Sequence, residues 1–261
     1  MNDRPLPLDK IEAVAALIAE SNRVVVFTGA GVSTESGIPD FRSPGGIWSR
    51  FDPDDFTIDK FLYDPECRRK QWRFLLNSGL FDQAEPNEAH RAVAWLESIG
   101  KLQCVITQNV DDLHQRAGND PSRVYELHGN MRWIKCLGCY ERFTLGSILQ
   151  TGRESDEVPS CPHCRGLLKP DVIFFGEALP EQTLREANRH AATCDLLIVI
   201  GSSLVVYPAA YIPIYAKGGG AKLVIINLSE TPYDANADIV IHAPAGATMS
   251  AVVEALRKRL H

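Results

Sequence analysis

The chain of 261 residues is 45% hydrophobic and 23% charged, proportions that are typical of a folded globular protein with a sizeable core. Its formal net charge is −6 and it contains no basic block, which argues against a dedicated nucleic-acid-binding protein. No apolar run reaches the length of a membrane span, and residues 1–10 lack the apolar stretch of a signal peptide. We therefore expect a cytoplasmic protein that binds neither nucleic acid nor a membrane.

Amphipathic helices and short buried strands alternate along most of the chain, as the spacing of apolar residues indicates. In chain order we expect helix 8–21, strand 24–27, short helices within 43–80, helix 86–99, strands 102–107 and 124–127, strand 172–175, helix 180–192, strand 196–200, helix 207–216 interrupted by Pro213, strands 223–226 and 239–241, and helix 250–260. This order predicts an α/β protein with a doubly wound, mostly parallel, Rossmann-like sheet.

Four of the seven cysteines form two C-x-x-C pairs separated by 21 residues. This spacing is typical of a zinc module in which four thiolates surround the metal and leave no open position, so the zinc is expected to be structural. His163 lies inside the second pair and is expected not to bind the metal. We expect the remaining cysteines, Cys67, Cys104 and Cys194, to be small buried apolar residues. The expected zinc ligands are Cys136, Cys139, Cys161 and Cys164.

The cysteine pairs and an aromatic-rich segment interrupt the alternation. We expect a Rossmann-like domain from 1–44, 84–134 and 168–261, with a smaller inserted domain formed by a helical module (45–83) and a zinc ribbon (135–167). In the helical module the aromatic spacing favours packing residues over a binding platform. Those aromatic residues are Trp48, Phe51, Phe56, Phe61, Trp72 and Phe74.

Four of the expected strands end in glycine or small polar residues, at 28–31, 108–109, 201–203 and 227–229. A lone Gly-x-Gly after a strand is a weak signal and also fits a plain strand-to-helix turn. In a doubly wound sheet, however, such strand ends share one edge and form a crevice suited to a dinucleotide. The acidic residue that usually binds the adenine ribose is missing about 20 residues after the glycines, where Trp48 and Ser49 stand. An ordinary hydride-transfer site is therefore not expected.

Taken together, these segments resemble the signature of the sirtuins, the NAD-dependent protein-lysine deacylases. The matching segments are GAGVS at 29–33, SGIPDFR at 36–42, TQNVD at 107–111 with LH at 113–114, LHG at 127–129, the four cysteines, FGE at 175–177, GSSL at 201–204 and NL at 227–228. The resemblance covers essentially the whole chain. Asp112 stands where relatives often have glycine, and it either adds negative charge near the nicotinamide pocket or faces solvent. Ser229 stands where many relatives have glycine or an acid.

The resemblance implies that His128 is the general base and that Asn109 is a second catalytic residue. It also implies that Phe41 lies on a lid and shields the reacting ribose, and that Val110 and Asp111 hold the nicotinamide carboxamide. His114 is expected to pack in the interior. The residues implied in binding NAD, the co-substrate, are Gly29, Ala30, Gly31, Ser33, Thr34, Asp40, Phe41, Arg42, Gln108, Asn109, Val110, Asp111, His128, Gly201, Ser202, Ser203, Asn227, Leu228, Ser229 and Ala245.

The partners implied are acyl-lysine proteins, bound as an added strand between 176–177 and 205–207. The acyl group would pass to ADP-ribose, with release of nicotinamide and O-acetyl-ADP-ribose. Relatives that prefer succinyl or malonyl groups carry a Tyr-x-x-Arg pair, but here Glu66 follows Tyr63 at that spacing, so we expect neutral acyl groups, acetyl first. The residues implied in binding substrate are Ile173, Phe175, Gly176, Glu177, Val205, Val206 and Tyr207.

Two other functions remain open on the sequence. A mono-ADP-ribosyltransferase would use the same NAD site but would add mass to a protein target. A non-catalytic NAD-sensing zinc module would bind NAD without turnover, although the joint presence of Phe41, Asn109, Asp111 and His128 argues against it.

Overall fold

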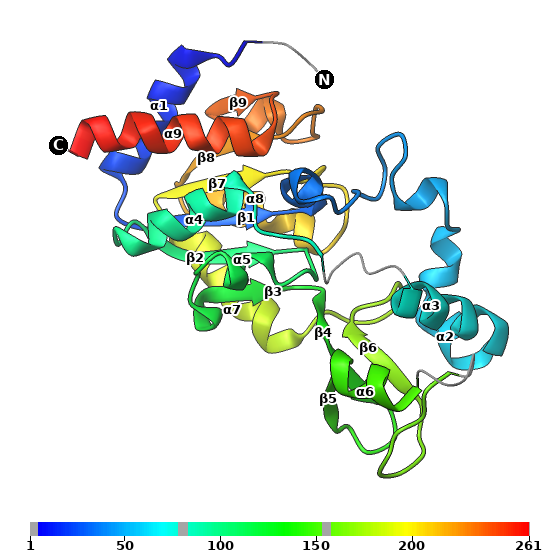
Figure 1. Ribbon diagram of the computed structural model, residues 1–261. Coiled ribbons are helices and arrows are strands. Elements are labelled where there is room, and N and C mark those ends of the chain that lie inside the picture. The colour runs from blue at the N-terminus through cyan, green and yellow to red at the C-terminus, as the bar shows by residue number, and fades with distance from the viewer. Residues whose placement is uncertain (1–4, 78–82, 153–157, 261) are drawn as a thin grey trace.

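The computed structural model describes residues 5–77, 83–152 and 158–260. Four short stretches lie outside the described residues, namely 1–4, 78–82, 153–157 and 261. They belong, in that order, to the expected segments 1–44, 45–83, 135–167 and 168–261. The chain forms a large layered α/β part and a smaller part that lies at one end of it (Figure 1).

The large part is built on a six-stranded sheet in the order β3-β2-β1-β7-β8-β9, and every pairing in it is parallel. Its strands are β1 (Val24–Thr28), β2 (Leu102–Thr107), β3 (Val124–Glu126), β7 (Leu196–Ile200), β8 (Lys222–Ile226) and β9 (Ile239–Ile241). In chain order within this sheet the arrangement is 3-2-1-4-5-6, the order of a Rossmann-like doubly wound sheet. The predicted fold class is therefore confirmed.

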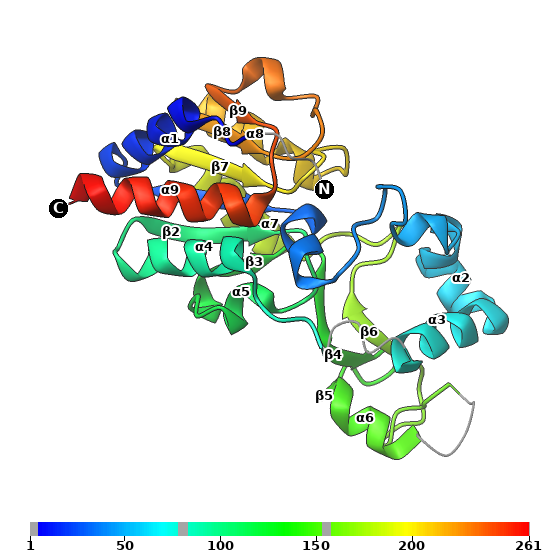
Figure 2. The ribbon, with the colours of Figure 1, turned by 45° about the horizontal axis from the view of Figure 1, so that its top comes forward.

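Helices cover both faces of this sheet, and its strands are therefore buried on both sides (Figure 2). Side chains of β1 alternate between the two layers, with Val24 and Val26 in one apolar cluster and Val25 and Phe27 in the other. The first layer holds α1 (Leu8–Glu20), α4 (Glu88–Ser98) and α9 (Ala245–Leu260), and the second holds α7 (Glu181–Thr193) and α8 (Ile212–Gly218).

The smaller part combines short helices with a three-stranded antiparallel sheet in the order β5-β4-β6. Its apolar core joins the two, since Phe61 and Trp72 of the helices pack with Ile134, Leu168 and Phe174. The elements are η2 (Ile47–Ser49), η3 (Pro53–Phe56), α2 (Ile58–Tyr63), α3 (Pro65–Asn77), β4 (Gly129–Cys136), β5 (Arg142–Thr144), α6 (Leu145–Gly152) and β6 (Leu168–Val172).

One expected strand is wrong in position and in sheet. The expected strand 172–175 is in fact β6 (Leu168–Val172), which pairs with β4 in the small sheet, while Phe175 makes only an isolated bridge with Thr57. An apolar run indicates burial but does not say which sheet a strand joins. The small sheet therefore begins at Gly129 and ends at Val172. Its strands extend beyond both ends of the expected zinc ribbon, 135–167.

Smaller differences concern helix ends. The glycine turn leads into a 3₁₀ helix, η1 (Ala30–Ser36), and Pro213 lies in the first turn of α8 instead of interrupting a helix. Pro is favourable there because the first N–H groups of a helix have no partner within it. The remaining short elements are α5 (Leu113–Arg116), η4 (Pro121–Arg123), η5 (Ala209–Tyr211) and η6 (Asp234–Asn236).

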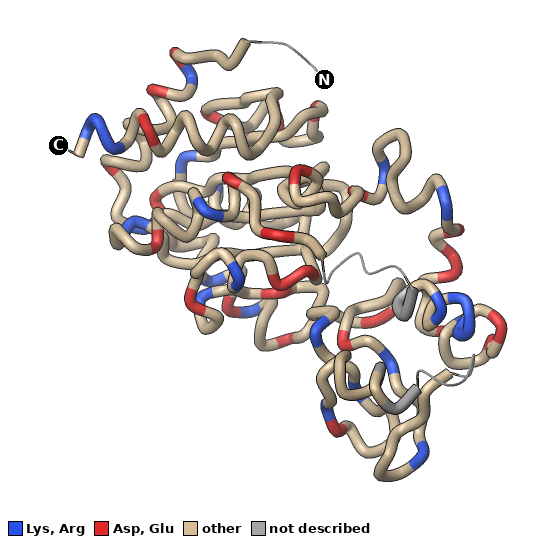
Figure 3. Tube along the Cα trace, in the orientation of Figure 1, with Lys and Arg blue, Asp and Glu red and all other residues tan. Residues whose placement is uncertain are grey.

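Positive and negative residues are interspersed along the trace of both parts (Figure 3). None of the helices in the described part of the chain combines the length and apolarity that a membrane crossing requires.

Candidate active site

The carboxyl ends of four strands meet where the strand order reverses, between β1 and β7. Hydrogen bonds tie their loops together beyond the strands. The Gln108 N–H donates to the Thr28 carbonyl (3.0 Å), and the Gly31 N–H donates to the Gly201 carbonyl (2.8 Å). The Ser202 hydroxyl then donates to Gln108 Oε1 (2.8 Å). Three of the four predicted polar strand ends therefore form one connected wall.

The glycines of the opening motif lie against protein backbone. A Cβ atom on Gly31 would lie 2.8 Å from Gly201 Cα, and one on Gly29 would lie 2.9 Å from Ser202 Cα. Gly201 has a φ of +63°, and a Cβ there would lie 2.2 Å from the Val32 nitrogen. These glycines are thus required for the close approach of the β1 and β7 loops.

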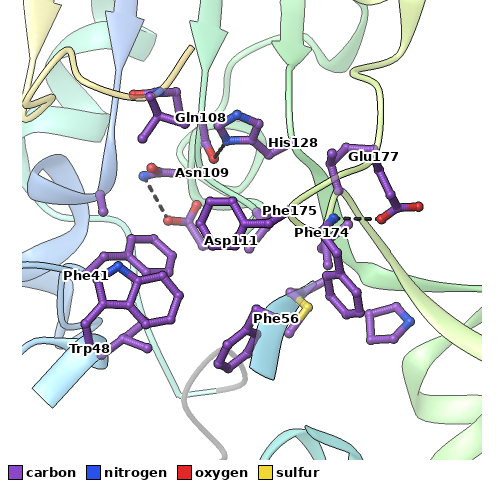
Figure 4. Close-up of a pocket in the computed structure, with 18 of the residues that line it drawn as sticks. Phe41, Trp48, Phe56, Gln108, Asn109, Asp111, His128, Phe174, Phe175 and Glu177 are labelled. Atoms are coloured by element: carbon purple, nitrogen blue, oxygen red, sulfur yellow. Dashed lines mark hydrogen bonds between the residues drawn. The ribbon is translucent and has the colours of Figure 1, made fainter. Parts of the chain in front are cut away.

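A cavity of about 310 Å³ opens at this wall and extends to the small part of the chain. Figure 4 shows Gln108, Asn109 and His128 on one side and the rings of Phe41, Trp48 and Phe56 on the other. The site therefore lies between the large sheet and the small part, and both supply side chains to it.

A buried polar network supports the floor of the cavity. The Ser33 hydroxyl donates to Asp111 Oδ2 (2.7 Å), and Asn109 Nδ2 donates to both Ser33 Oγ (3.0 Å) and Asp111 Oδ2 (3.2 Å). The Leu113 N–H donates to Asp111 Oδ1 (3.0 Å), which fixes the carboxylate. All three polar side chains are more than nine-tenths buried, so the network is held rigidly in place.

His90 lies beneath this network, with its Nε2 3.4 Å from Ser33 Oγ. Burial lowers the pKa of His90 to about 4, although the charge of Asp111 opposes the shift. His90 is therefore neutral near pH 7. His114 is also buried and contacts Thr28 Oγ1 through Nε2 (2.9 Å), so it packs in the interior as expected.

His128 follows β3 and is half-buried at the edge of the cavity. Its Nδ1 lies 3.0 Å from the Gln108 carbonyl oxygen, which can only accept a hydrogen bond. Nδ1 therefore carries the proton in the neutral ring, and Nε2 has a free lone pair. Burial lowers the pKa of His128, although the hydrogen bond to Gln108 opposes this. The arrangement is that of a neutral imidazole fixed in one tautomer.

The loop after η1 folds over the cavity. Asp40 Oδ1 accepts hydrogen bonds from the N–H groups of Arg42 (2.8 Å) and Ser43 (2.7 Å). Burial opposes the shift, but hydrogen bonds from Ser43 and Arg42 keep the pKa of Asp40 below its usual value. Phe41 packs on Trp48, with ring centroids 5.1 Å apart, and its side chain is exposed.

The interpretation of the aromatic residues as packing residues is only partly right. Phe61 and Trp72 are buried in the small core, but Trp48, Phe56 and Phe74 line the cavity. Trp48 contacts both Phe56 (centroids 5.4 Å apart) and Phe175 (6.1 Å). Spacing along a short helix cannot distinguish the two cases, because a ring that lines a cavity is also half-buried.

The far end of the strand edge holds the other predicted NAD residues. Asn227 Nδ2 donates to the Ser229 carbonyl (2.7 Å), and Leu228 is exposed. Ala245 is buried at the start of α9, and the neighbouring Gly246 N–H donates to Glu35 Oε1 (2.7 Å).

Asp112 has a φ of +63° and forms an ion pair with Arg132 (3.1 Å), so its charge is compensated.

Two segments flank the mouth of the cavity, 173–177 and 205–207. Phe175, Val205 and Tyr207 are exposed there. Within the part of the chain that the structure describes, the N–H groups of Gly176, Val205 and Tyr207 have no hydrogen-bond partner. One backbone donor of the first segment and two of the second are therefore free to pair with a further strand.

The comparisons with known proteins agree with this geometry. The model of the Sir2 family matches residues 29–208. An NAD-dependent protein deacetylase of Pyrobaculum aerophilum is 45% identical over 256 residues, which cover 97% of this chain and 97% of that protein. The chain belongs to the Sir2 family. It is an NAD-dependent protein deacetylase, and the predicted sirtuin resemblance is confirmed.

Other members of the Sir2 family are similarly close. An NAD-dependent protein deacylase of Archaeoglobus fulgidus is 44% identical over 252 residues, 96% of this chain and 97% of that protein. A solved Sir2–p53 peptide–NAD+ complex has a TM-score of 0.86 and 41% identity, and the match covers 96% of this chain and 99% of that one. NAD as co-substrate, expected from the sequence, is confirmed for this Sir2-family chain.

The four predicted zinc ligands of this Sir2-family chain converge at the end of the small sheet. Their Sγ atoms all lie within 4.8 Å of one another, with Cys136 and Cys164 3.4 Å apart and Cys139 and Cys161 3.7 Å apart. Tetrahedral zinc with Zn–S bonds of about 2.3 Å requires S–S distances of about 3.8 Å. Four thiolates at these distances fit zinc and leave no position for a substrate. His163 instead contacts Glu141.

Reasoning from the sequence missed several residues that shape the Sir2 site. The sequence predicts only an amphipathic helix around His90, and it favours a packing role for Trp48 and Phe56. A histidine on the apolar face of a helix was the one available signal, since it needs a polar partner once buried. Lys169 gave no signal, because its burial depends on how β6 pairs with β4.

Proposed function

We propose that this deacetylase removes neutral acyl groups, acetyl first, from lysine side chains, with His128 as general base. The observation that carries the proposal is the neutral His128 ring, whose Nε2 is free at the cavity while Nδ1 is held by Gln108. The acyl group passes to ADP-ribose, and the products are the free lysine, nicotinamide and O-acetyl-ADP-ribose.

We assign NAD to the connected wall at the carboxyl ends of β1, β2 and β7 and to the neighbouring end of β8. NAD supplies an anomeric carbon that loses nicotinamide and ribose hydroxyls that can attack the acyl group. The network of Ser33, Asn109 and Asp111 supports this assignment, because its fixed amide and carboxylate suit the nicotinamide end. Phe41 and Trp48 would exclude water from the reacting carbon. The residues of 201–203 and 227–229, with Ala245, would bind the adenosine half.

His128 suits proton removal from a ribose hydroxyl, since its Nε2 is unprotonated near pH 7. Burial lowers its pKa from the usual 6.5. Only the neutral imidazole accepts a proton, so activity should fall as the pH drops through the lowered pKa. We expect the acidic midpoint of kcat to lie below 6.5 when kcat is measured between about pH 5 and 8 at saturating NAD and peptide. A midpoint above 6.5 would contradict the assigned environment.

We assign the acyl-lysine peptide to the space between 173–177 and 205–207, where it would pair as an added strand. The unpartnered N–H groups of Gly176, Val205 and Tyr207 support this assignment. Ile173 and Phe175 would flank the lysine. Among the described residues that line the cavity, Arg42 is the one lysine or arginine, and it lies on the lid. A carboxylate-bearing acyl group would thus lack a dedicated cation.

The test is incubation with NAD and peptides of one sequence that carry acetyl-, propionyl- or succinyl-lysine, read by mass spectrometry. We expect NAD-dependent loss of the acyl mass, a matching O-acyl-ADP-ribose, and removal of acetyl faster than succinyl. Faster succinyl removal would overturn the acyl preference. Mass added to a protein target would favour the mono-ADP-ribosyltransferase, and binding of NAD without turnover would favour the non-catalytic module. Unchanged absorbance from NADH separates all three from hydride transfer.

A further inference from the structure

Lys169 is the one lysine or arginine that is buried among the described residues, with 4% of its surface exposed. It lies in β6, opposite Lys135 of β4. Its Nζ forms an ion pair with Glu177 Oε2 (2.8 Å) and donates to the carbonyl oxygens of Val172 and Pro170. The same Nζ lies 4.3 Å from the centroid of the Phe174 ring. All three N–H groups of the ammonium therefore have partners within one short stretch of chain.

Glu177 closes a tight turn around this ammonium. The Glu177 N–H donates to the Phe174 carbonyl (3.0 Å), and Gly176 between them has a φ of +89°, as a type II turn requires. The Glu177 carboxylate returns to accept the Phe174 N–H at 2.7 Å, and Figure 4 shows this bond at the edge of the cavity. One carboxylate oxygen thus binds both the turn and Lys169.

The same stretch is connected to the proposed base. The Ile173 N–H donates to the His128 carbonyl (2.9 Å), and Val172 pairs with Gly129. On the other side, the Phe175 N–H donates to the Phe56 carbonyl (3.0 Å). The Lys169 ammonium is therefore at the centre of a segment that joins the His128 loop to the helices of the small part.

We propose that Lys169 is a positioning residue for the acyl-lysine substrate, which acts through Glu177 to hold the 173–177 turn in the conformation that accepts the peptide strand. This inference rests on the proposed pairing of the peptide with 173–177. Lys169 does not touch the substrate, because its side chain is enclosed by the turn.

The chemistry of the site shows how a lysine is accommodated at this buried position. Burial lowers the pKa of Lys169, and the carboxylate of Glu177 opposes that shift. Without Glu177 the ammonium would be a buried charge without a charged partner, whereas the Glu177 side chain is 24% exposed. The pair therefore favours a single arrangement of the turn, because other arrangements leave one charge unpaired.

The test compares Lys169→Met with Lys169→Arg in the full-length, zinc-loaded enzyme. Met is an unbranched side chain one atom shorter than Lys and removes the charge, while Arg keeps the charge. We expect Lys169→Met to raise the KM for an acetyl-lysine peptide about tenfold or more, with the KM for NAD changed less than about twofold. Lys169→Arg should restore most of the peptide KM. The matched control is Lys135→Met, which removes the cross-strand lysine of the same sheet and should leave both KM values unchanged.

A merely structural role would lower the amount of folded enzyme, and hence the apparent kcat, but not the peptide KM. An unchanged peptide KM in folded Lys169→Met overturns the proposal. If that variant does not fold, Glu177→Gln removes the same ion pair from its more exposed side, and an unchanged peptide KM there overturns it equally. If the proposed function itself were wrong, the wild-type enzyme would not remove the acyl group. That result is distinct from failure of the Lys169 proposal, which appears only in the variants.

Discussion

Replacement of His128 by alanine is expected to lower kcat for acetyl-lysine removal by about 10²–10⁴-fold, the range typical of a lost general base. The physical reason is that the variant lacks the imidazole Nε2 that accepts the ribose hydroxyl proton. The hydrogen bonds of the Ser33–Asn109–Asp111 network do not involve His128, so NAD binding should change little. Steady-state kinetics with saturating NAD, together with circular dichroism to verify folding, provide the measurement.

The matched control for this prediction is His163→Ala. His163 is exposed, lies within the second C-x-x-C pair and contacts Glu141 at the surface. Its replacement should leave kcat and zinc content unchanged. If His128→Ala kept wild-type activity while folded, His128 would not be the base, and another group would have to accept the proton.

Removal of zinc is expected to abolish peptide deacetylation by disordering the small part of the chain. Structural zinc contributes roughly 10–16 kcal/mol of apparent binding free energy in zinc-finger peptides, which is more than a small three-stranded sheet can replace. The loss reaches the site because Cys136 ends β4, which pairs with β6 and so supports the 173–177 turn. Cys139 and Cys164 are exposed, so a chelator has access to the cluster.

The measurement combines metal content, circular dichroism and deacetylation after treatment with a chelator, and it is repeated with Cys139→Ser. Both treatments should remove the metal and the activity, and added zinc should restore both to the chelated wild type alone. Cys194→Ala is the control, since Cys194 is buried near the end of α7, away from the cluster. Full activity in metal-free enzyme would show that the small part folds without zinc.

Much of the fold could be predicted because the sequence pattern is local. Apolar runs that end in glycine or small polar residues predicted β1, β2, β7 and β8, and their alternation with amphipathic helices predicted a parallel sheet. Since parallel strands point the same way, a shared site at their carboxyl ends follows from the order of elements alone. The C-x-x-C spacing predicted the metal cluster for a similar reason, because two close pairs need only one turn each to present their thiolates.

What the sequence by itself determined is therefore the fold class, the edge of the sheet that holds the site, and the metal cluster. Only the tertiary structure decided that β6 joins the small sheet, that Gly29 and Gly31 contact the Gly201 loop, and that Lys169 is buried beneath the 173–177 turn. The physical reason is that these features depend on pairs of residues far apart in the chain. Hydrophobic periodicity reports how much of a residue is buried, but not which distant backbone or charge it is buried against.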